Sequence, residues 1–224
     1  MKLPPLSLLE TRVLGVLVEK QHTVADTYPL TLNALVAGCN QKTSRDPVLN
    51  ATDGEVQMAI DHLRSLSLIV ESSGGRVMRY AHNVERVLSL PSQSVALLAA
   101  LMLRGAQTVA ELRTSSERLH RFADVSAVEG FLHELAARSE GALVEELPKA
   151  AGERENRWVH LLSGRDAALA ALAAVPASGA ATDTLALSEL AAVKASIVEM
   201  RAEIERLSAS IARLRAELGA LPDR

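Results

Sequence analysis

Three stretches with apolar residues at helical spacing, separated by polar connectors, fill most of the first 70 residues. The first and third open with capping boxes, formed by Ser7 with Glu10 and by Thr52 with Glu55. The second opens near Pro29, a residue favoured in the first turn of a helix. Two strand-like segments, "LIVES" and "RVMRYAH", then flank the hairpin signal "SSGG". The pattern predicts the order helix, helix, helix, strand, turn, strand.

The same order recurs in the next part of the chain. The helical stretches "SQSVALLAALMLRG", "TVAELRTSSERLHRF" and "SAVEGFLHELAARS" precede the strand-like "ALVEELP" and "NRWVHLLS", and Ser126 with Glu129 predicts a capping box for the third helix. The third helices of the two copies share one apolar spacing, at Val56, Ala59, Ile60 and Leu63 and at Val128, Phe131, Leu132 and Leu135. We therefore predict a mainly α protein with small β-hairpins, built as two tandem winged-helix domains at residues 1–90 and 91–164.

The chain changes character after residue 164. Residues 165–184 are Ala-rich and contain Pro176 and Gly179, which predicts a linker. Residues 185–224 carry apolar residues in an unbroken heptad repeat, which predicts a coiled-coil helix. Isoleucine dominates one heptad series and leucine the later part of the other, a combination that favours a parallel homodimer. The residues expected at this interface are Leu190, Ile197, Ile204, Leu207, Ile211, Leu214 and Leu218.

Composition and charge place the chain among folded proteins of the cytoplasm. Hydrophobic residues make up 48% and charged residues 23%, and the net charge is −3. Residues 1–90 carry nine basic and nine acidic side chains and residues 91–164 carry eight and ten, so neither part forms a general nucleic-acid coat. A single cysteine excludes an intramolecular disulfide and fits a reducing compartment. The longest apolar runs are far shorter than the roughly 20 residues of a membrane helix.

No sequence pattern points to a catalytic or metal site. None of the six histidines lies three to five residues from another histidine or from the cysteine, as a metal motif requires. P-loop, nucleophile-elbow and dinucleotide-binding glycine motifs are absent. Cys39 opens the polar stretch "CNQKTSRDPV", where a packing role is favoured over a reactive thiol beside Lys42. We expect no enzymatic activity, no metal, no cofactor and no membrane contact.

Four unusual strings spread over both predicted domains suggest a family: "VEKQ", "YPLTLNALVAGCNQKTSRDPV", "LRGAQTVAEL" and "RWVHLLSG". On these strings the chain resembles the YceH-like family of bacterial proteins over nearly its whole length. The resemblance implies tandem winged helices, in agreement with the hydrophobic pattern. It implies no particular activity and supplies no catalytic or binding residues.

Positive charge collects around the third helix of the first predicted domain. Lys42 and Arg45 lie in the connector before this helix, and Arg76 and Arg79 lie in and after the wing turn, where winged helices commonly contact phosphate. We therefore favour a transcription-regulator-like protein that binds duplex DNA through the first domain and these four residues. The competing interpretation of the connector is a solvated loop whose polar side chains cap helix ends.

The outward faces of the third helices favour a different function. On a helical wheel the predicted outward residues are Gly54, Met58, Asp61 and Ser65 in the first domain and Gly130, His133, Glu134 and Ala137 in the second. Neither face offers the side chains that usually read base edges. The alternative function is therefore a protein–protein interaction module in which the winged helices dock an unidentified protein.

The predicted second helix of the second domain carries three arginines with acidic residues interspersed among them. These residues are Arg113, Arg118 and Arg121, with Glu111, Glu117 and Asp124 between and beside them. Because acids and bases are interspersed, the sequence predicts a solvated face here.

Overall fold

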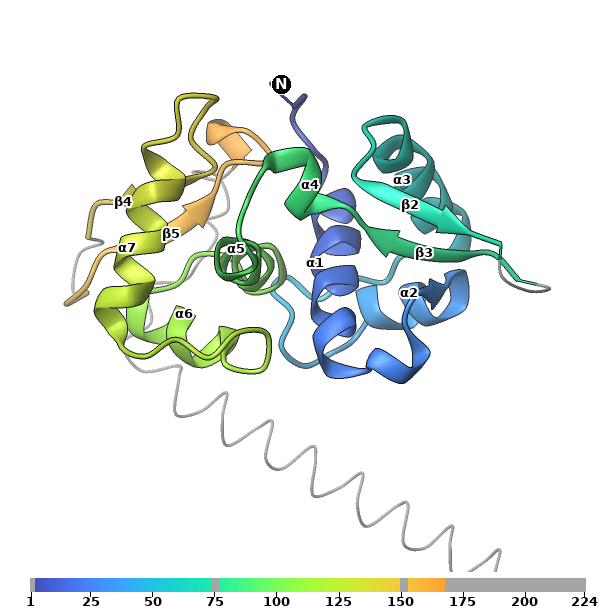
Figure 1. Ribbon diagram of the computed structural model, residues 1–224, viewed down its shortest axis with the longest axis horizontal. Helices are drawn as coiled ribbons and strands as arrows, with labels where there is room; N and C mark the ends of the chain where they lie inside the picture. Colours follow the sequence, from blue (N-terminus) through green and yellow to red (C-terminus); the bar gives the residue numbers. More distant parts are fainter. Residues whose placement is uncertain (1–2, 74–76, 150–152, 168–224) are drawn as a thin grey trace, which may run out of the picture. The chain divides into compact units, whose positions relative to one another are not determined.

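The computed structural model describes residues 3–73, 77–149 and 153–167, and this part of the chain is mainly helical with small antiparallel sheets (Figure 1). The described residues belong to one compact unit. The predicted linker beyond residue 167 and the predicted coiled-coil helix, with all its interface residues, lie outside the described residues. Arg76 of the wing turn lies outside them as well.

The first half contains the predicted helices and hairpin together with two further elements. Its helices are α1 (Leu8–Thr23), α2 (Leu32–Cys39), α3 (Asp53–Ser65) and α4 (Val84–Leu88), with a 3-10 turn at Ala25–Thr27. Its strands are β1 (Leu30–Thr31), β2 (Ile69–Ser72) and β3 (Arg79–His82), in the sheet order β1-β3-β2. The additions are β1 and α4. Leu30 and Thr31 pair with Tyr80 and Arg79, so the segment after Pro29 is a strand and α2 begins later than predicted.

The second half repeats the order of three helices followed by a hairpin. Its elements are α5 (Ser92–Arg104), α6 (Val109–Ser116), α7 (Val125–Ala136), β4 (Val144–Leu147) and β5 (Arg157–His160). The two strands pair antiparallel, with Val144 opposite His160 and Leu147 opposite Arg157. Gln107, just before α6, forms an isolated bridge with Trp158, which ties the start of α6 to this hairpin.

Side-chain caps set where the helices begin, and one predicted cap is wrong. Ser7 caps α1 and Thr52 caps α3 in the predicted capping boxes with Glu10 and Glu55. The third helix of the second half starts earlier than the Ser126 box predicts, because Asp124 is its N-cap and accepts a hydrogen bond from the Ala127 amide at 2.8 Å. Ser126 therefore lies inside the first turn of α7.

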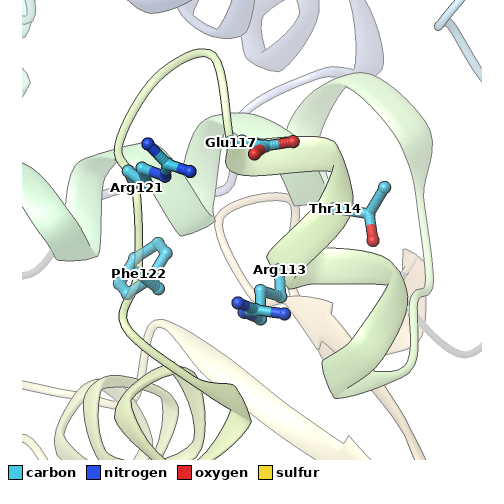
Figure 2. Close-up of a pocket in the computed structure, with 5 residues that line it drawn as sticks. All are labelled: Arg113, Thr114, Glu117, Arg121 and Phe122. Atoms are coloured by element: carbon cyan, nitrogen blue, oxygen red, sulfur yellow. The ribbon is translucent and has the colours of Figure 1, made fainter.

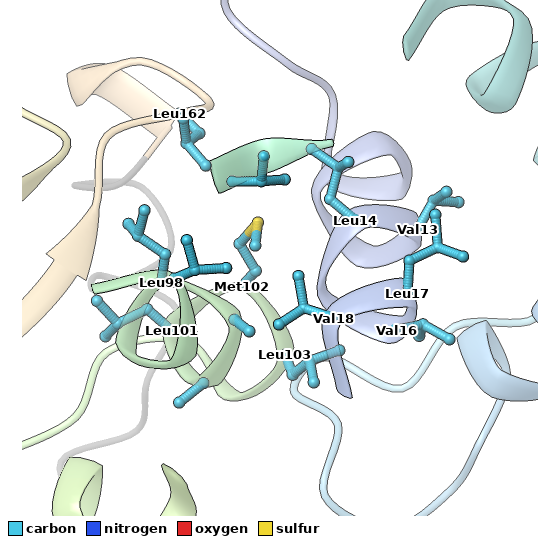
Figure 3. Packing of buried hydrophobic residues seen from close by; sticks show 14 of the residues in the cluster. Val13, Leu14, Val16, Leu17, Val18, Leu98, Leu101, Met102, Leu103 and Leu162 are labelled. Carbon is cyan, nitrogen blue, oxygen red and sulfur yellow. The ribbon is translucent and has the colours of Figure 1, made fainter. Parts of the chain in front are cut away.

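The two halves share one hydrophobic core. Helix α5 is buried on nearly all sides from Ser94 to Leu103, as expected for a helix that is apolar all round. Val18 points from α1 towards α5, and Leu103 points back (Figure 3). A methyl group on Gly15 would lie only 2.9 Å from Cγ of Leu103, so α1 and α5 approach closely because this position has no side chain.

The third helices pack as their apolar spacing predicts. All four predicted residues of α3, from Val56 to Leu63, are buried. On α7 the predicted residues are buried as well, except Phe131, which is half-buried against the core. These anchored faces fix which side of α3 and α7 is left for solvent or for a partner.

Candidate phosphate-binding surface

The polar connector between α2 and α3 is anchored to the protein by a buried arginine on α1. Arg12 is fully buried, and its guanidinium donates to the backbone oxygens of Cys39 at 3.2 Å and of Pro47 at 2.7 Å. Burial raises the pKa of the Cys39 thiol to about 12, although Arg12 and Arg45 oppose this rise. The thiol therefore stays protonated and packs in the core, and the reactive-thiol hypothesis gains no support.

Arg45 in the same connector was predicted to contact phosphate, and its position argues against that role. Its side chain is fully buried and makes a two-pronged ion pair with Glu19 of α1, at 2.6 and 3.1 Å. Its Nε donates to the backbone oxygen of Gly38 at 3.1 Å. Burial alone would raise the pKa of Glu19, but hydrogen bonds and charge from Arg45 outweigh this effect and hold it below the ordinary value. Arg45 therefore fixes the connector in place instead of facing a ligand.

The two other predicted phosphate contacts that the structure describes, Arg79 and Lys42, differ in how far other groups of the protein occupy their hydrogen-bond donors. Arg79 is exposed, but its guanidinium donates to the backbone oxygens of Thr27 at 3.2 Å and Pro29 at 2.8 Å, so part of its donor capacity is used to hold the turn before α2. Lys42 is exposed on the connector. Of the three predicted residues that the structure describes, Lys42 is the one that best suits a phosphate contact.

The outward face of α3 is exposed as predicted, and its polar groups satisfy one another. Gln57 donates to Asp61 at 3.1 Å, and Arg64 binds both carboxylate oxygens of Glu71 on β2 at 2.9 Å. Met58 at the centre of this face is 67% exposed. A helix face with paired charges and a central methionine is poorly equipped to read base edges.

A different group of basic side chains, on α6 and the turn after it, remains available. Arg113, Arg118 and Arg121 are exposed, and within residues 3–73, 77–149 and 153–167 no ion pair joins them to a carboxylate. Other arginines do have such pairs, at 2.5–2.9 Å: Arg64, Arg138, Arg157 and Arg165. Arg113, Arg118 and Arg121 therefore form a local group of exposed guanidinium groups that no ion pair with a carboxylate compensates among the described residues.

Two of the three acidic residues interspersed with these arginines in the sequence cap helices and do not pair with the arginines. Glu111 completes the capping box of α6 with Thr108 and accepts a hydrogen bond from Arg157 at 2.8 Å. Asp124 caps α7. Only Glu117 remains beside the arginines. The sequence predicted a solvated face, and the three arginines are indeed exposed. Charges counted along the chain do not show that these acids cap helices, although the capping signal at Thr108 and Glu111 reveals the role of one of them.

Two of the arginines border a small hollow. Arg113, Thr114, Glu117, Arg121 and Phe122 line a cavity of about 110 Å³, and Arg113 on α6 lies across from Arg121 and Phe122 on the turn (Figure 2). The guanidinium of Arg113 also donates to the backbone oxygen of Ala123 at 3.3 Å, which holds it near the turn. Phe122 is buried edge-on against Phe131, so it supports the turn from beneath. Two guanidinium groups held across such a hollow can bind the oxygens of one phosphate group.

The described part of the chain offers neither a metal site nor a membrane-spanning helix. No cluster of three or more His, Cys, Asp or Glu side chains that could hold a metal ion occurs among the described residues. No described helix combines the length and the apolar character that crossing a membrane requires. The arginines on and after α6 are therefore the candidate group for ligand binding in this part of the chain.

These observations define the class: a mainly helical protein whose two helix-and-hairpin halves share a core and expose a local arginine surface. The family profile described as "Protein of unknown function, DUF480" matches residues 6–153. The UPF0502 protein of Methylibium petroleiphilum is 58% identical over 214 residues, covering 96% of this chain and 90% of that protein. The UPF0502 protein of Burkholderia ambifaria is 56% identical over 211 residues, covering 94% and 88%. The chain therefore belongs to this bacterial family of unknown function, and the family resemblance in its sequence is confirmed.

Proposed function

We propose that this protein is a non-enzymatic tandem winged-helix protein that binds the phosphate backbone of duplex DNA. The contacts we assign are Arg113 and Arg121 of the second half together with Lys42 of the connector. The observation that carries the proposal is the pair of exposed arginines whose neighbouring acids cap helices instead of pairing with them. Lys42 is included because it is exposed on the connector, and the residue before it, Gln41, lines a crevice that Arg118 also lines.

The fold supports a winged-helix assignment, and the third helices favour binding without sequence preference. Each half has three helices followed by an antiparallel hairpin, which is the element order of a winged helix. The outward face of α3 is internally paired, and the outward face of α7 includes Glu134 and Gly130. Contacts to phosphates position a protein on DNA without reading its bases. The proposal therefore moves the DNA contact from the first domain alone to a surface that both halves build.

Salt-dependent binding to a duplex of random sequence tests this proposal. Three phosphate contacts give a slope of about −2.7 for log affinity against log salt, because each contributes about −0.9. The double variant Arg113→Gln/Arg121→Gln should reduce the slope to about −0.9 by the same reasoning. A matched control, Arg86→Gln/Lys149→Gln, removes two exposed cations elsewhere and should leave the slope unchanged. Equal losses in both variants, or no binding at low salt, would contradict the proposal.

A second candidate function, docking of another protein, is favoured by exposed apolar side chains on α3 and the hairpin of the first half. Four of the eight large exposed hydrophobic side chains among the described residues lie there: Met58, Val70, Val77 and Met78. Apolar side chains that gather on one surface are typical of protein–protein contacts. If the duplex shows no binding, this surface becomes the leading candidate, and the double variant Met58→Ser/Met78→Ser is the one to compare in partner binding.

We also propose that the protein acts as a homodimer in the cytoplasm. The unbroken heptads at residues 185–224 support association through a parallel coiled coil. The cytoplasmic assignment rests on the single cysteine, which is buried as a free thiol. Light scattering should give a dimer mass for the whole chain and a lower mass for a chain cut after Thr184. A monomeric whole chain at micromolar concentration would end the coiled-coil hypothesis.

A further inference from the structure

A second hollow, of about 200 Å³, lies where the two halves meet. We call it the crevice, and its lining residues differ from those of the hollow beside Phe122. Its walls come from the end of α1, the connector after α2, the end of α5 and the turn after α6. Both halves are needed to form it, and the shared core beneath it holds them together. Leu103, at the end of α5, faces α1 at this junction (Figure 3).

The charges around this crevice are strongly unbalanced. Lys20, Arg104 and Arg118 line it, and Glu19 is its only acidic lining residue. Glu19 is already bound on both carboxylate oxygens by Arg45, whose side chain is fully buried. With Arg45 included, these five groups carry a net of three positive charges. An anion entering the crevice would meet this excess in a partly enclosed space, where charge interactions are stronger than in open solvent.

Hydrogen-bond donors are available at the crevice in addition to charge. Arg118 is exposed and has no carboxylate partner in the described part of the chain. The ammonium of Lys20 lies 3.2 Å from Glu19 and 3.5 Å from Gln41 and can still offer a donor to a ligand. Arg104 donates to the Ser44 hydroxyl at 2.8 Å, which places this guanidinium against the connector. Arginine and lysine together match the several acceptor oxygens of a phosphate group.

Part of the crevice lining is apolar. Val24, Leu103 and Leu119 line it beside the charged groups, and Val24 is 41% exposed. A cavity of about 200 Å³ is below the usual range for drug-sized ligands, so its ligand is small. We propose that this crevice binds a small phosphate monoester, with the phosphoryl group on Lys20 and Arg118 and a small apolar group against the leucines.

This proposal goes beyond DNA binding and uses different residues. Arg113 and Arg121 border the other hollow and do not line the crevice. The same phosphoryl chemistry could also come from a DNA backbone, so the experiment separates the two sources.

Phenyl phosphate is a suitable probe because it joins a dianionic phosphoryl group to one small ring. Its binding to the full-length protein is measured by calorimetry, for the wild type and for the Arg118→Gln and Lys20→Gln variants. Each variant should bind roughly tenfold more weakly, because each loses a charge-assisted hydrogen bond. The matched control Arg86→Gln, an exposed arginine on α4, should bind like the wild type. Thermal melting of every variant checks that the fold is retained.

Several outcomes would overturn the assignment. The crevice is not a phosphate site if phenyl phosphate does not bind the wild type at millimolar concentration, or if Arg118→Gln and Arg86→Gln bind it equally. If inorganic phosphate binds as tightly as phenyl phosphate, the apolar lining contributes nothing and the monoester class is wrong. If duplex DNA displaces phenyl phosphate, the phosphoryl group belongs to a DNA backbone. Loss of DNA binding in Arg113→Gln/Arg121→Gln with phenyl phosphate binding retained would show that the two sites are separate.

Discussion

The connector after α2 and the turn after α6 occupy the same place in the two halves, yet they use arginine in opposite ways. In the connector, Arg45 is buried against Glu19 and holds the backbone in place. After α6, Arg121 stays exposed, and nearby Glu111 and Asp124 cap helices. Whether an arginine in a polar segment is structural or available for binding therefore depends on where the neighbouring carboxylates are used, more than on how many there are.

The largest expected effect separates these two kinds of arginine. Arg45→Ala should lower the free energy of unfolding by about 3–5 kcal/mol, because it removes a fully buried side chain and leaves the partly buried Glu19 carboxylate with the Lys20 ammonium in place of two guanidinium hydrogen bonds. Arg113→Ala should change it by no more than about 0.5 kcal/mol, since it removes an exposed side chain. Urea unfolding of both variants measures the contrast. If both variants lose a similar free energy of unfolding, Arg45 stabilises the fold no more than the exposed Arg113 does.

A paired substitution sharpens the explanation. The double variant Arg45→Met/Glu19→Met removes both members of the buried ion pair and leaves only the partly exposed Lys20 without its carboxylate, so it should be more stable than Arg45→Ala. If the double variant is equally unstable, the ion pair matters less than the bond from Arg45 to the Gly38 carbonyl.

The second expected effect concerns a feature on which the halves agree. His82 ends β3 and His160 ends β5, and burial lowers the pKa of each imidazole to about 4, helped at His82 by the charge of His22. Both stay neutral in the folded protein, whereas in the unfolded chain they take up protons below about pH 6.5. The contribution of these two histidines to the free energy of unfolding is therefore fully present above pH 6.5, and it is lost as the pH falls from 6.5 towards 4.

Unfolding measured at a series of pH values tests this expectation. Between pH 6.5 and 4, each histidine adds up to about 1.4 kcal/mol per pH unit to the slope of the free energy of unfolding against pH. His82→Gln and His160→Gln should each remove the slope that comes from the substituted residue. A wild-type stability that is flat between pH 6.5 and 5 would contradict the neutral state of both imidazoles.

The smallest expected effect tests the corrected start of α7. Asp124→Ala should cost about 1 kcal/mol of stability, because it removes the acceptor for the Ala127 amide. Ser126→Ala should cost much less, since Ser126 is not the cap. Thermal unfolding of the two variants distinguishes the caps, and an equal or larger loss for Ser126→Ala would restore the original capping box.

Much of the fold could be predicted because its signals are local. The spacing of Val56, Ala59, Ile60 and Leu63 identifies the buried face of α3, and the capping boxes at Ser7 and Thr52 mark two helix starts. The short strand β1 could not be predicted, because Leu30 and Thr31 form it only by pairing with β3, far along the chain. Likewise the cap of α7 was misplaced because both Asp124 and Ser126 suit an N-cap and the register decides between them.

The candidate site was harder to predict because charge counting does not show burial. Lys42 was correctly expected on an exposed connector, whereas nothing local distinguishes it from Arg45 three residues later. The partner of Arg45 is Glu19, on another helix, so only the tertiary structure reveals the pair. The arginines on and after α6 were expected on a solvated face and are exposed, but charges counted along the chain could not show that Glu111 and Asp124 serve as helix caps.

The close approach of α1 and α5 at Gly15 also determines how the chain can be divided. A fragment that ends at residue 90 would keep α1 but lose the helix that packs against Gly15 and Val18 (Figure 3). Apolar side chains that become exposed to solvent make a fragment prone to aggregation. We therefore expect proteases to find no clean cut between the halves, and the smallest well-behaved piece of this protein to include both.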